Sequence, residues 1–455
     1  MKTLLIYPPF CTPASPPYSI TNIHAFLKNN LPEEHTIEVL DLNIEFHKRM
    51  FPEQQKYYQK MLKNYDTKKY DNITNDYKKV SKQTYSRNNK NVVEGGRPEL
   101  FDELLDTILA GKPDMVAFSI VYSSQCFFAY SLLKELSKRG IKTVIGGPAI
   151  NDKLKTVATP LGNELELLSF IVGKPIEHNT LNFSTVLDYN IYNMDDYFTP
   201  EPVIPIRASN TCYYQKCAFC THHTGSPYFE FSLKNIKESI VNSGQKNIFL
   251  VDDMIHRQRL LEIAEVFGPL GITWSCQLKP TIDLDEETLK TLHDSGLNVV
   301  TWGVESASDR VLKLMRKGTN IEDATKVIRA SHKAGITNVT YIILGFPTET
   351  EEEAITTIDW LKGNEAHIDL VSTAIFGLQK GSPVYNNPEE FCITKITETK
   401  RTILDESIEY EVSEGMTKED ANDFRGRYKR TLENINKVSK NMNFFREHLL
   451  VLSKR

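Results

Sequence analysis

The sequence predicts an α/β protein in which two successive series of alternating strands and helices are followed by a helical tail. Short apolar runs alternate with amphipathic segments of helical length in both halves of the chain. This alternation is typical of βαβ units with parallel strands and right-handed crossovers. Ligands of such sheets bind where the carboxyl ends of the strands meet. Residues that directly follow the predicted strands are therefore the first candidates for function.

Length and composition exclude several classes of protein. The 455 residues correspond to about three domains. A chain of this size needs no disulfide or structural metal in order to fold. A net charge of −5 argues against nucleic acid as the main partner. The sequence contains no apolar run of the roughly 20 residues that span a bilayer and no signal peptide at its start. Seven cysteines, an odd number at low density, indicate the reducing cytoplasm.

The first series predicts a Rossmann-like parallel sheet within residues 1–175. Strands are expected at 3–7, 36–42, 115–120 and 143–145, and helices at 19–31 and 127–138. Ser119, Gly146 and Gly147 follow strands in this series. Together with residues 8–10 and 122–124 they form the candidate ligand-binding edge.

An insertion at about residues 46–98 interrupts the first series. It is rich in Lys, Asn, Gln and Tyr, and six tyrosines lie between Tyr57 and Tyr85. Such a composition can form a helical insertion with one solvated face or an aromatic, basic surface for nucleic acid. Interleaved acidic residues and the negative net charge favour the helical insertion.

The second series predicts a partial (β/α)6 barrel at residues 203–392. A polar segment, 176–202, is interpreted as a linker, and residues 393–455 as a charged helical region. Strands are expected at 203–207, 247–251, 273–277, 298–304, 339–344 and 368–375, and helices at 233–243, 258–267, 286–295, 310–315, 321–334 and 351–361. Six repeats are too few to close an eight-stranded barrel.

Three cysteines, Cys212, Cys217 and Cys220, lie close together after the first strand of the second series. With His222 or His223 they can form a four-ligand zinc site. Alternatively, the three thiolates can hold an iron–sulfur cube and leave one iron open to a substrate. The residue types alone do not distinguish these two sites.

The cysteine loop resembles that of radical S-adenosylmethionine (SAM) enzymes. The family spacing is Cys-x3-Cys-x2-Cys with an aromatic residue before the last cysteine, a place that Phe219 occupies here. Four residues separate Cys212 from Cys217, so the motif is a variant with one extra residue. Five later segments resemble the same family in its order, namely 249–253, 302–306, 311–318, 343–350 and 376–383.

The N-terminal half resembles the cobalamin-binding domain that precedes some radical SAM domains. The similarity rests on segments 7–9, 40–43, 113–119 and 146–148. Two departures are present: the Asp-x-His-x-x-Gly motif that offers a histidine to cobalt is absent, and residues 172–175 replace a Gly-Glu-Gly-Glu-like turn.

The resemblance implies a [4Fe-4S] cluster on the three cysteines, with SAM chelating the open iron and cleaved to a 5′-deoxyadenosyl radical. It also implies roles in SAM binding. Asp252 or Asp253 accepts from the ammonium group, Glu305 takes the ribose, Phe219 and Gly345 meet adenine through their backbones, and Lys279 or Arg329 pairs with the carboxylate. The alternative for Asp252, Asp253 and Glu305 is a helix cap.

The expected function is therefore radical SAM chemistry, with cobalamin delivering a methyl group to an unactivated carbon. One alternative is a radical SAM enzyme without cobalamin that cross-links or rearranges a peptide or small natural product. Another is a non-catalytic zinc or iron–sulfur protein. An external electron donor such as flavodoxin or ferredoxin is implied, because the chain shows no flavin motif. The substrate is not specified, and neither a membrane nor nucleic acid is expected as a partner.

Overall fold

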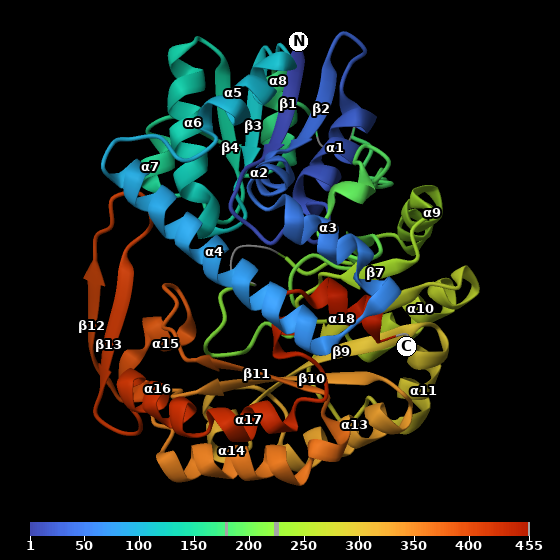
Figure 1. The fold of residues 1–455 in the computed structure, drawn as a ribbon, viewed down its shortest axis with the longest axis vertical. Helices are drawn as coiled ribbons and strands as arrows, with labels where there is room; N and C mark the ends of the chain where they lie inside the picture. Colours follow the sequence, from blue (N-terminus) through green and yellow to red (C-terminus); the bar gives the residue numbers. More distant parts are fainter. Residues whose placement is uncertain (178–180, 223–226, 454–455) are drawn as a thin grey trace. The chain divides into compact units, whose positions relative to one another are not determined.

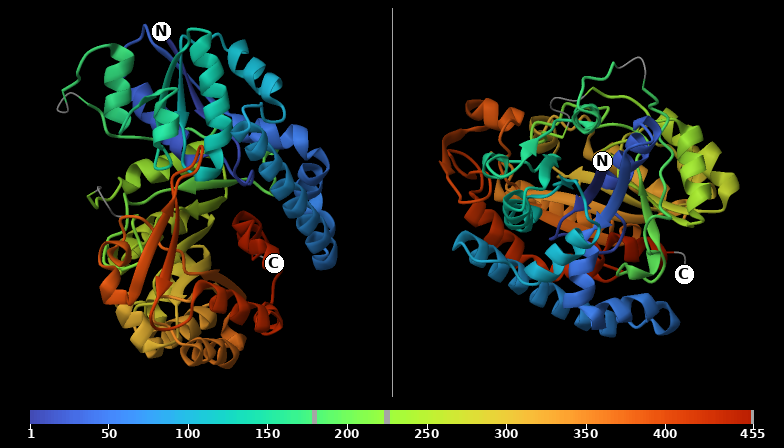
Figure 2. Two further views of the ribbon diagram at one scale, coloured as in Figure 1. Left: turned by 90° about the vertical axis from the view of Figure 1, so that its left-hand side faces the viewer. Right: turned by 90° about the horizontal axis from the view of Figure 1, so that it is seen from above.

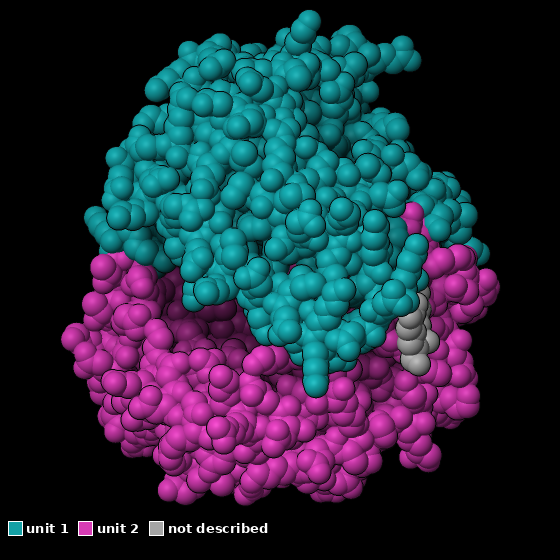
Figure 3. Space-filling view, viewed as in Figure 1, with its two compact units in different colours: residues 1–205, 234–244, 400–406 teal, residues 206–233, 245–399, 407–455 magenta. Residues whose placement is uncertain are grey.

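The chain folds into two compact units in a computed structural model that describes residues 1–177, 181–222 and 227–453. Unit 1 comprises Met1–Pro205, Lys234–Gly244 and Lys400–Glu406, and unit 2 comprises Ile206–Leu233, Gln245–Thr399 and Ser407–Arg455 (Figure 3). The predicted boundaries near residues 175 and 202 remain predictions.

Unit 1 contains a five-stranded parallel sheet in the order β2-β1-β3-β4-β5 (Figure 1). Its strands are β1 (Lys2–Tyr7), β2 (Thr36–Asp41), β3 (Met115–Ser119), β4 (Lys142–Gly146) and β5 (Thr159–Pro160). Because β1 lies between β2 and β3, the winding of the chain reverses there, and the carboxyl ends of β1 and β3 form a switch point at which ligands bind in such folds. The predicted Rossmann-like sheet is confirmed.

Two helices of unit 1, α1 (Tyr18–Asn30) and α8 (Glu164–Val172), share an apolar cluster with the sheet. The other helices of the unit are α2 (Leu42–Met50), α3 (Pro52–Lys60), α4 (Thr67–Val93), α5 (Phe101–Ala110), α6 (Cys126–Lys138), α7 (Asp152–Lys155) and most of α9 (Leu233–Ser243). Leu5 and Met115 of the sheet pack against Ile20 and Leu27 of α1 and Leu168 of α8. Burial of these side chains fixes which face of each helix turns inward.

The insertion is helical, and its tyrosines form a core. Asp66 caps α4 by accepting a hydrogen bond of 2.7 Å from the Lys69 backbone N–H. Tyr58 of α3 and Tyr70 and Tyr77 of α4 are almost completely buried. Burial raises the pKa of Tyr58. Because these aromatic rings point inward, they are not available as a stacking surface for nucleic acid.

Unit 2 is built on a six-stranded sheet whose order follows the sequence from β6 to β11. The strands are β6 (Val203–Ile206), β7 (Asn247–Leu250), β8 (Thr273–Leu278), β9 (Leu297–Glu305), β10 (Thr337–Leu344) and β11 (Leu370–Ile375). The helices between them are α10 (Arg257–Phe267), α11 (Glu286–Asp294), α12 (Asp309–Leu314), α13 (Ile321–Lys333) and α14 (Glu351–Gly363). The pairs from β7 to β11 are parallel, so their carboxyl ends share one edge. The predicted partial barrel is confirmed.

The C-terminal region is helical only in its second part, which corrects the sequence prediction. It begins with an antiparallel pair, β12 (Ile393–Thr399) and β13 (Ser407–Val412), visible as two long orange strands (Figures 1 and 2). Its helices are α16 (Lys418–Arg427), α17 (Lys429–Ile435) and α18 (Arg446–Leu452), and a short α15 (Pro383–Asn386) precedes the hairpin. Most residues of β12 are exposed, and exposed and half-buried residues alternate in the second half of β13, so the charged composition of the segment resembles that of a solvated helix.

Candidate functional site

The three-cysteine loop follows β6 and is anchored through Ala218, one of the two residues between its last two cysteines. Ala218 is completely buried in an apolar cluster with Val311 and Met315. Its backbone N–H donates to the Met315 carbonyl over 2.9 Å. Cys217 and Cys220 flank this anchor and are partly exposed, as is Cys212. The loop is therefore held at the carboxyl edge of the barrel with its thiols accessible.

Tyr214 provides a second anchor for the same loop. Its hydroxyl donates to the Arg316 carbonyl over 2.8 Å. The chain passes beneath the tyrosine at Gly318, which has a φ of +67° and no room for a Cβ against the Tyr214 ring. A glycine is required there both by the left-handed backbone and by the close approach.

Asp252 holds the chain at the start of the loop. Its buried carboxylate accepts hydrogen bonds from the backbone N–H groups of Ala208 at 2.9 Å and Ser209 at 2.7 Å, and from the Ser209 hydroxyl at 2.7 Å. Burial raises its pKa. Asp252 is therefore not the helix cap, because His256 caps α10. The Asp252 carboxylate is buried and already accepts these hydrogen bonds, so it is not free to bind a ligand.

Asp253, the next residue, lies beside the other end of the loop. Its carboxylate is 2.9 Å from Nδ1 of His222, and this hydrogen bond raises the pKa of the imidazole. The His222 backbone N–H in turn donates to Cys220 Sγ over 3.4 Å. Asp253 is therefore the acidic residue of this pair that faces the cysteines. The second loop histidine, His223, lies outside the described residues.

Glu305 ends β9 and forms a buried ion pair with Lys317. The Lys317 Nζ is 2.7 Å from Glu305 Oε1 and 5.8 Å from the centre of the Phe219 ring. Burial opposes the charge on Lys317, but Glu305 and the Cys217 thiol hold its pKa above the ordinary value. The alternative role of Glu305 as a helix cap is wrong, because Ser308 caps α12. Sequence reasoning missed Lys317, since nothing in its spacing from Glu305 indicates a contact.

Lys279 follows β8 and is buried without a carboxylate partner in the part of the chain that the structure describes. It is 3% exposed, and its Nζ lies 3.3 Å from the centre of the Tyr214 ring. Burial and the nearby Lys317 lower the pKa of Lys279 to about 8. The charge of a buried ammonium beside an aromatic face is stabilised in part by the ring, and a nearby anion would stabilise it further.

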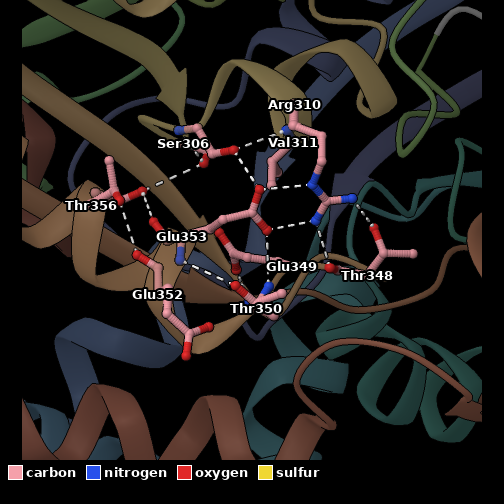
Figure 4. Close-up of polar contacts among 12 residues, drawn as sticks. Ser306, Arg310, Val311, Thr348, Glu349, Thr350, Glu352, Glu353 and Thr356 are labelled. Carbon is pink, nitrogen blue, oxygen red and sulfur yellow. Dashed lines mark hydrogen bonds and ion pairs between the residues drawn. The ribbon is translucent and has the colours of Figure 1, made fainter.

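The loop after β10 is fixed by its own side chains. Gly345, with a φ of +72°, donates its N–H to Glu349 Oε2 over 2.6 Å and is therefore not free to bind adenine through that group. Arg310 binds both carboxylate oxygens of Glu353 and also the hydroxyl and carbonyl oxygens of Thr348 (Figure 4). These contacts set the position of the barrel edge next to Glu305.

Arg329 lies away from this edge. It is on the exposed face of α13, and its Nε donates to Asn364 Oδ1 over 3.1 Å. Asn364 follows the end of α14, and both helices end where the strands begin, at the edge opposite the cysteines. Arg329 is therefore too far from the cysteine edge to contact SAM there.

The switch point of unit 1 is bound together by polar side chains. Gln125 donates to the Pro8 carbonyl over 2.7 Å and accepts from the Val121 N–H over 2.8 Å, which joins the ends of β1 and β3. The hydroxyl of Ser119 donates to Ser19 over 2.9 Å. Gly147 is exposed with a φ of +112°, and a Cβ there would collide with the Ile120 backbone. The edge thus presents backbone and small side chains to a ligand.

The donor set consists of three thiols, which is the number an iron–sulfur cube with one open iron requires, whereas a structural zinc site would need a fourth ligand. Within the described residues, no three His, Cys, Asp or Glu side chains converge on one metal position. Zinc needs its ligands within about 2.0–2.3 Å of one centre, whereas the thiolates of an iron–sulfur cube bind separate irons. Burial raises the pKa of Cys217 and Cys220, so both must lose a proton when they bind iron.

Comparison with known proteins identifies the class. Residues 206–361 match the Radical SAM superfamily. The three-cysteine loop and strands β7 to β10 lie within the segment that matches this superfamily.

Curated relatives are similar to this chain over part of its length. An uncharacterized methyltransferase of Pyrococcus horikoshii is 26% identical over 38% of this chain and 40% of its own length. The bacteriochlorophyllide d C-12(1)-methyltransferase of Chlorobaculum tepidum is 26% identical over 37% of this chain and 40% of its own. The chain therefore spans less than half of these relatives.

Two solved structures share the fold over nearly the whole chain. One is the radical SAM methyltransferase TsrM of Kitasatospora setae, solved with cobalamin and a [4Fe-4S] cluster; its TM-score is 0.65 at 14% identity, over 95% of this chain and 88% of that one. The other is the cobalamin-dependent radical SAM enzyme OxsB, with a TM-score of 0.61 at 13% identity over 99% of this chain and 71% of that one.

No helix among the described residues combines the length and apolarity needed to cross a membrane.

Proposed function

We propose that this chain is a radical SAM enzyme that holds a [4Fe-4S] cluster on Cys212, Cys217 and Cys220. The observation that carries the proposal is the loop itself: three accessible thiols, anchored at Ala218, at the carboxyl edge of a partial barrel of the radical SAM superfamily. The cluster, when bound, supplies one electron and an open iron for SAM.

In this proposal, different residues around the loop bind different groups of SAM. Lys279, the unpaired buried ammonium, pairs with the SAM carboxylate. Asp253 accepts from the SAM ammonium, and Glu305 accepts from the ribose hydroxyls while Lys317 holds it in place. The backbone of Phe219 contacts adenine. Asp252 positions the loop and does not touch the ligand.

The proposed outcome is methylation of an unactivated carbon, with cobalamin bound at the switch point of unit 1 beside Ser119, Gly146 and Gly147. The fold shared with TsrM and OxsB and the methyltransferase relatives support this reading. The second candidate is a radical SAM enzyme without cobalamin, favoured by the absence of a Gly-Glu-Gly-Glu-like turn at 172–175. The substrate is proposed to be a peptide or small molecule, in the reducing cytoplasm, with an external one-electron donor.

Anaerobic reconstitution with iron, sulfide and hydroxocobalamin tests the proposal. After reduction with dithionite and addition of SAM, we expect methionine and 5′-deoxyadenosine, with bound iron and cobalt measured on the same sample. Cys217→Ala is expected to lose iron and product formation together, whereas Cys392→Ala in the tail keeps both. Zinc retention without iron uptake would overturn the proposal. Iron and SAM cleavage without bound cobalt would select the second candidate.

A further inference from the structure

The cysteine loop has one residue more than the family spacing, and it contains Tyr214 between Cys212 and Cys217. Gln215, the next residue, has a φ of +53°, a backbone conformation typical of turns. The chain therefore turns directly after Tyr214 and leads back toward Cys217. The ring and the hydroxyl of Tyr214 both contact residues outside the loop.

The position of the Tyr214 ring is fixed by the segment that follows α12. The Tyr214 hydroxyl donates to the Arg316 carbonyl over 2.8 Å. A Cβ at Gly318 would collide with the ring, so the backbone there lies directly against it. These two contacts hold the ring in one place, independently of the side chain that lies on its face.

That side chain is Lys279. Its Nζ lies 3.3 Å from the centre of the Tyr214 ring, and the residue is 3% exposed. No carboxylate among the described residues pairs with Nζ. A lysine has a long flexible stem and loses much conformational freedom when its ammonium group is fixed. Because no counterion holds this ammonium, we infer that the ring of Tyr214 sets its position.

We propose that Tyr214 is a positioning residue for SAM recognition, because its ring holds the Lys279 ammonium at the place where the carboxylate of SAM binds. The inference rests on the proposed function, in which Lys279 pairs with that carboxylate, and it adds a role for the longer loop. Tyr214 itself does not touch SAM. An ammonium that is fixed before binding loses less conformational entropy when the carboxylate arrives, and the ring face stabilises its charge.

Calorimetric titration of the reconstituted enzyme with SAM and with decarboxylated SAM tests this role. We expect Tyr214→Leu to weaken SAM binding about three- to tenfold, the effect of one long side chain that must be immobilised on binding. Decarboxylated SAM is expected to bind Tyr214→Leu and wild type equally, because it lacks the group that Lys279 recognises. Tyr214→Phe keeps the ring and is expected to restore most of the affinity for SAM.

The neighbouring tyrosine offers a matched control. The ring of Tyr213 packs against that of His256, with 5.5 Å between their centres, and not against Lys279. Tyr213→Leu is therefore expected to bind SAM as the wild type does. An equal loss of SAM affinity in Tyr213→Leu and Tyr214→Leu would refute a specific role of Tyr214.

A double-mutant cycle shows whether Tyr214 acts through Lys279. In that case Tyr214→Leu weakens SAM binding in the wild type but adds nothing to the loss in Lys279→Met. Additive losses, an equal loss for SAM and decarboxylated SAM, or unchanged SAM affinity in Tyr214→Leu would each refute the proposal. Bound iron is measured on every variant. If Tyr214→Leu takes up no iron, Gly318→Ala, whose Cβ displaces the ring, supplies the same comparison.

Failure of the proposed function gives a different result. If the reconstituted wild type binds neither iron nor SAM, the proposed function itself fails. Loss of SAM affinity in Lys279→Met together with wild-type affinity in Tyr214→Leu overturns the role of Tyr214 alone.

Discussion

Among the side chains of the barrel edge, Lys279 gives the strongest indication of a bound anion. The burial of an ammonium group without a counterion lowers the stability of the fold. Tyr214 offsets part of this cost through its ring face, 3.3 Å from Nζ. A bound carboxylate would offset the rest. Arg329, which the sequence also suggested, is exposed to solvent and donates a hydrogen bond to Asn364, so its charge does not need such a ligand.

Replacing each of these cations by methionine separates the two roles. We expect Lys279→Met to weaken SAM binding at least tenfold, because a charged hydrogen bond contributes about 1.5–3 kcal/mol. Arg329→Met is expected to leave SAM affinity unchanged. Isothermal titration of the reconstituted enzyme with SAM measures both, and equal affinities for Lys279→Met and wild type would contradict the assignment.

Substitutions of the adjacent residues Asp252 and Asp253 are expected to affect different properties, namely stability and SAM binding. Asp252→Ala leaves the Ala208 and Ser209 N–H groups buried without acceptors and should lower the free energy of unfolding by about 2–5 kcal/mol. Asp253→Asn keeps stability within about 0.5 kcal/mol, as expected for a substitution away from a buried network, but weakens SAM binding. Urea unfolding followed by tryptophan fluorescence, together with SAM titration, measures the two effects. The reverse pattern would make Asp252 the ligand.

At the scale of elements, the loop between β10 and α14 contains a buried acid whose pKa lies well above its ordinary value. Burial raises the pKa of Glu349 to about 8; the Gly345 N–H and, more weakly, Arg310 oppose the shift, whereas Glu353 adds to it. Because the folded pKa lies above the unfolded value, the stability from the protonated acid is complete below about pH 4.5 and is lost as pH rises through about 8.

Glu349→Gln removes this titration and is expected to flatten the pH dependence of stability. Between pH 5 and about 9 the wild type should lose a few kcal/mol that the variant keeps, since each unit of pKa shift corresponds to about 1.4 kcal/mol. Glu352→Gln, at an exposed position in the first turn of α14, serves as the control. Urea midpoints at several pH values test the expectation. A Glu349→Gln slope equal to that of wild type would show that another group titrates.

Strands such as β1 and β3 could be predicted from the sequence because they are buried on both faces and read as continuous apolar runs. The exposed, two-residue β5 was not predicted. The hairpin of β12 and β13 was not predicted either, since neither strand is deeply buried and both are rich in charged residues. The three-cysteine site could be predicted from the spacing of its cysteines. The ion pair between Lys317 and Glu305 could not be predicted, because it depends on how the chain returns after α12. The outward position of Arg329 was readable, however, from the buried neighbours Val327 and Ile328 on the same helix.

At the scale of the whole molecule, the two compact units have separate apolar cores and distinct proposed ligands. The chain's three tryptophans, Trp274, Trp302 and Trp360, all belong to unit 2. Tryptophan fluorescence therefore reports unfolding of unit 2 alone, whereas far-ultraviolet circular dichroism reports both units. The chain thus contains an internal probe that tells which unit a ligand stabilises.

Hydroxocobalamin is expected to stabilise unit 1 and not unit 2. At a hundredfold excess over Kd a ligand adds about 2.7 kcal/mol to the state that binds it. For a unit of this size the melting temperature then rises by roughly 5–10 °C. The shift should appear in the circular dichroism transition and be absent from front-face tryptophan fluorescence, which serves as the control within the same sample. If saturating hydroxocobalamin moves neither transition, unit 1 does not bind cobalamin and the radical chemistry of this chain proceeds without it.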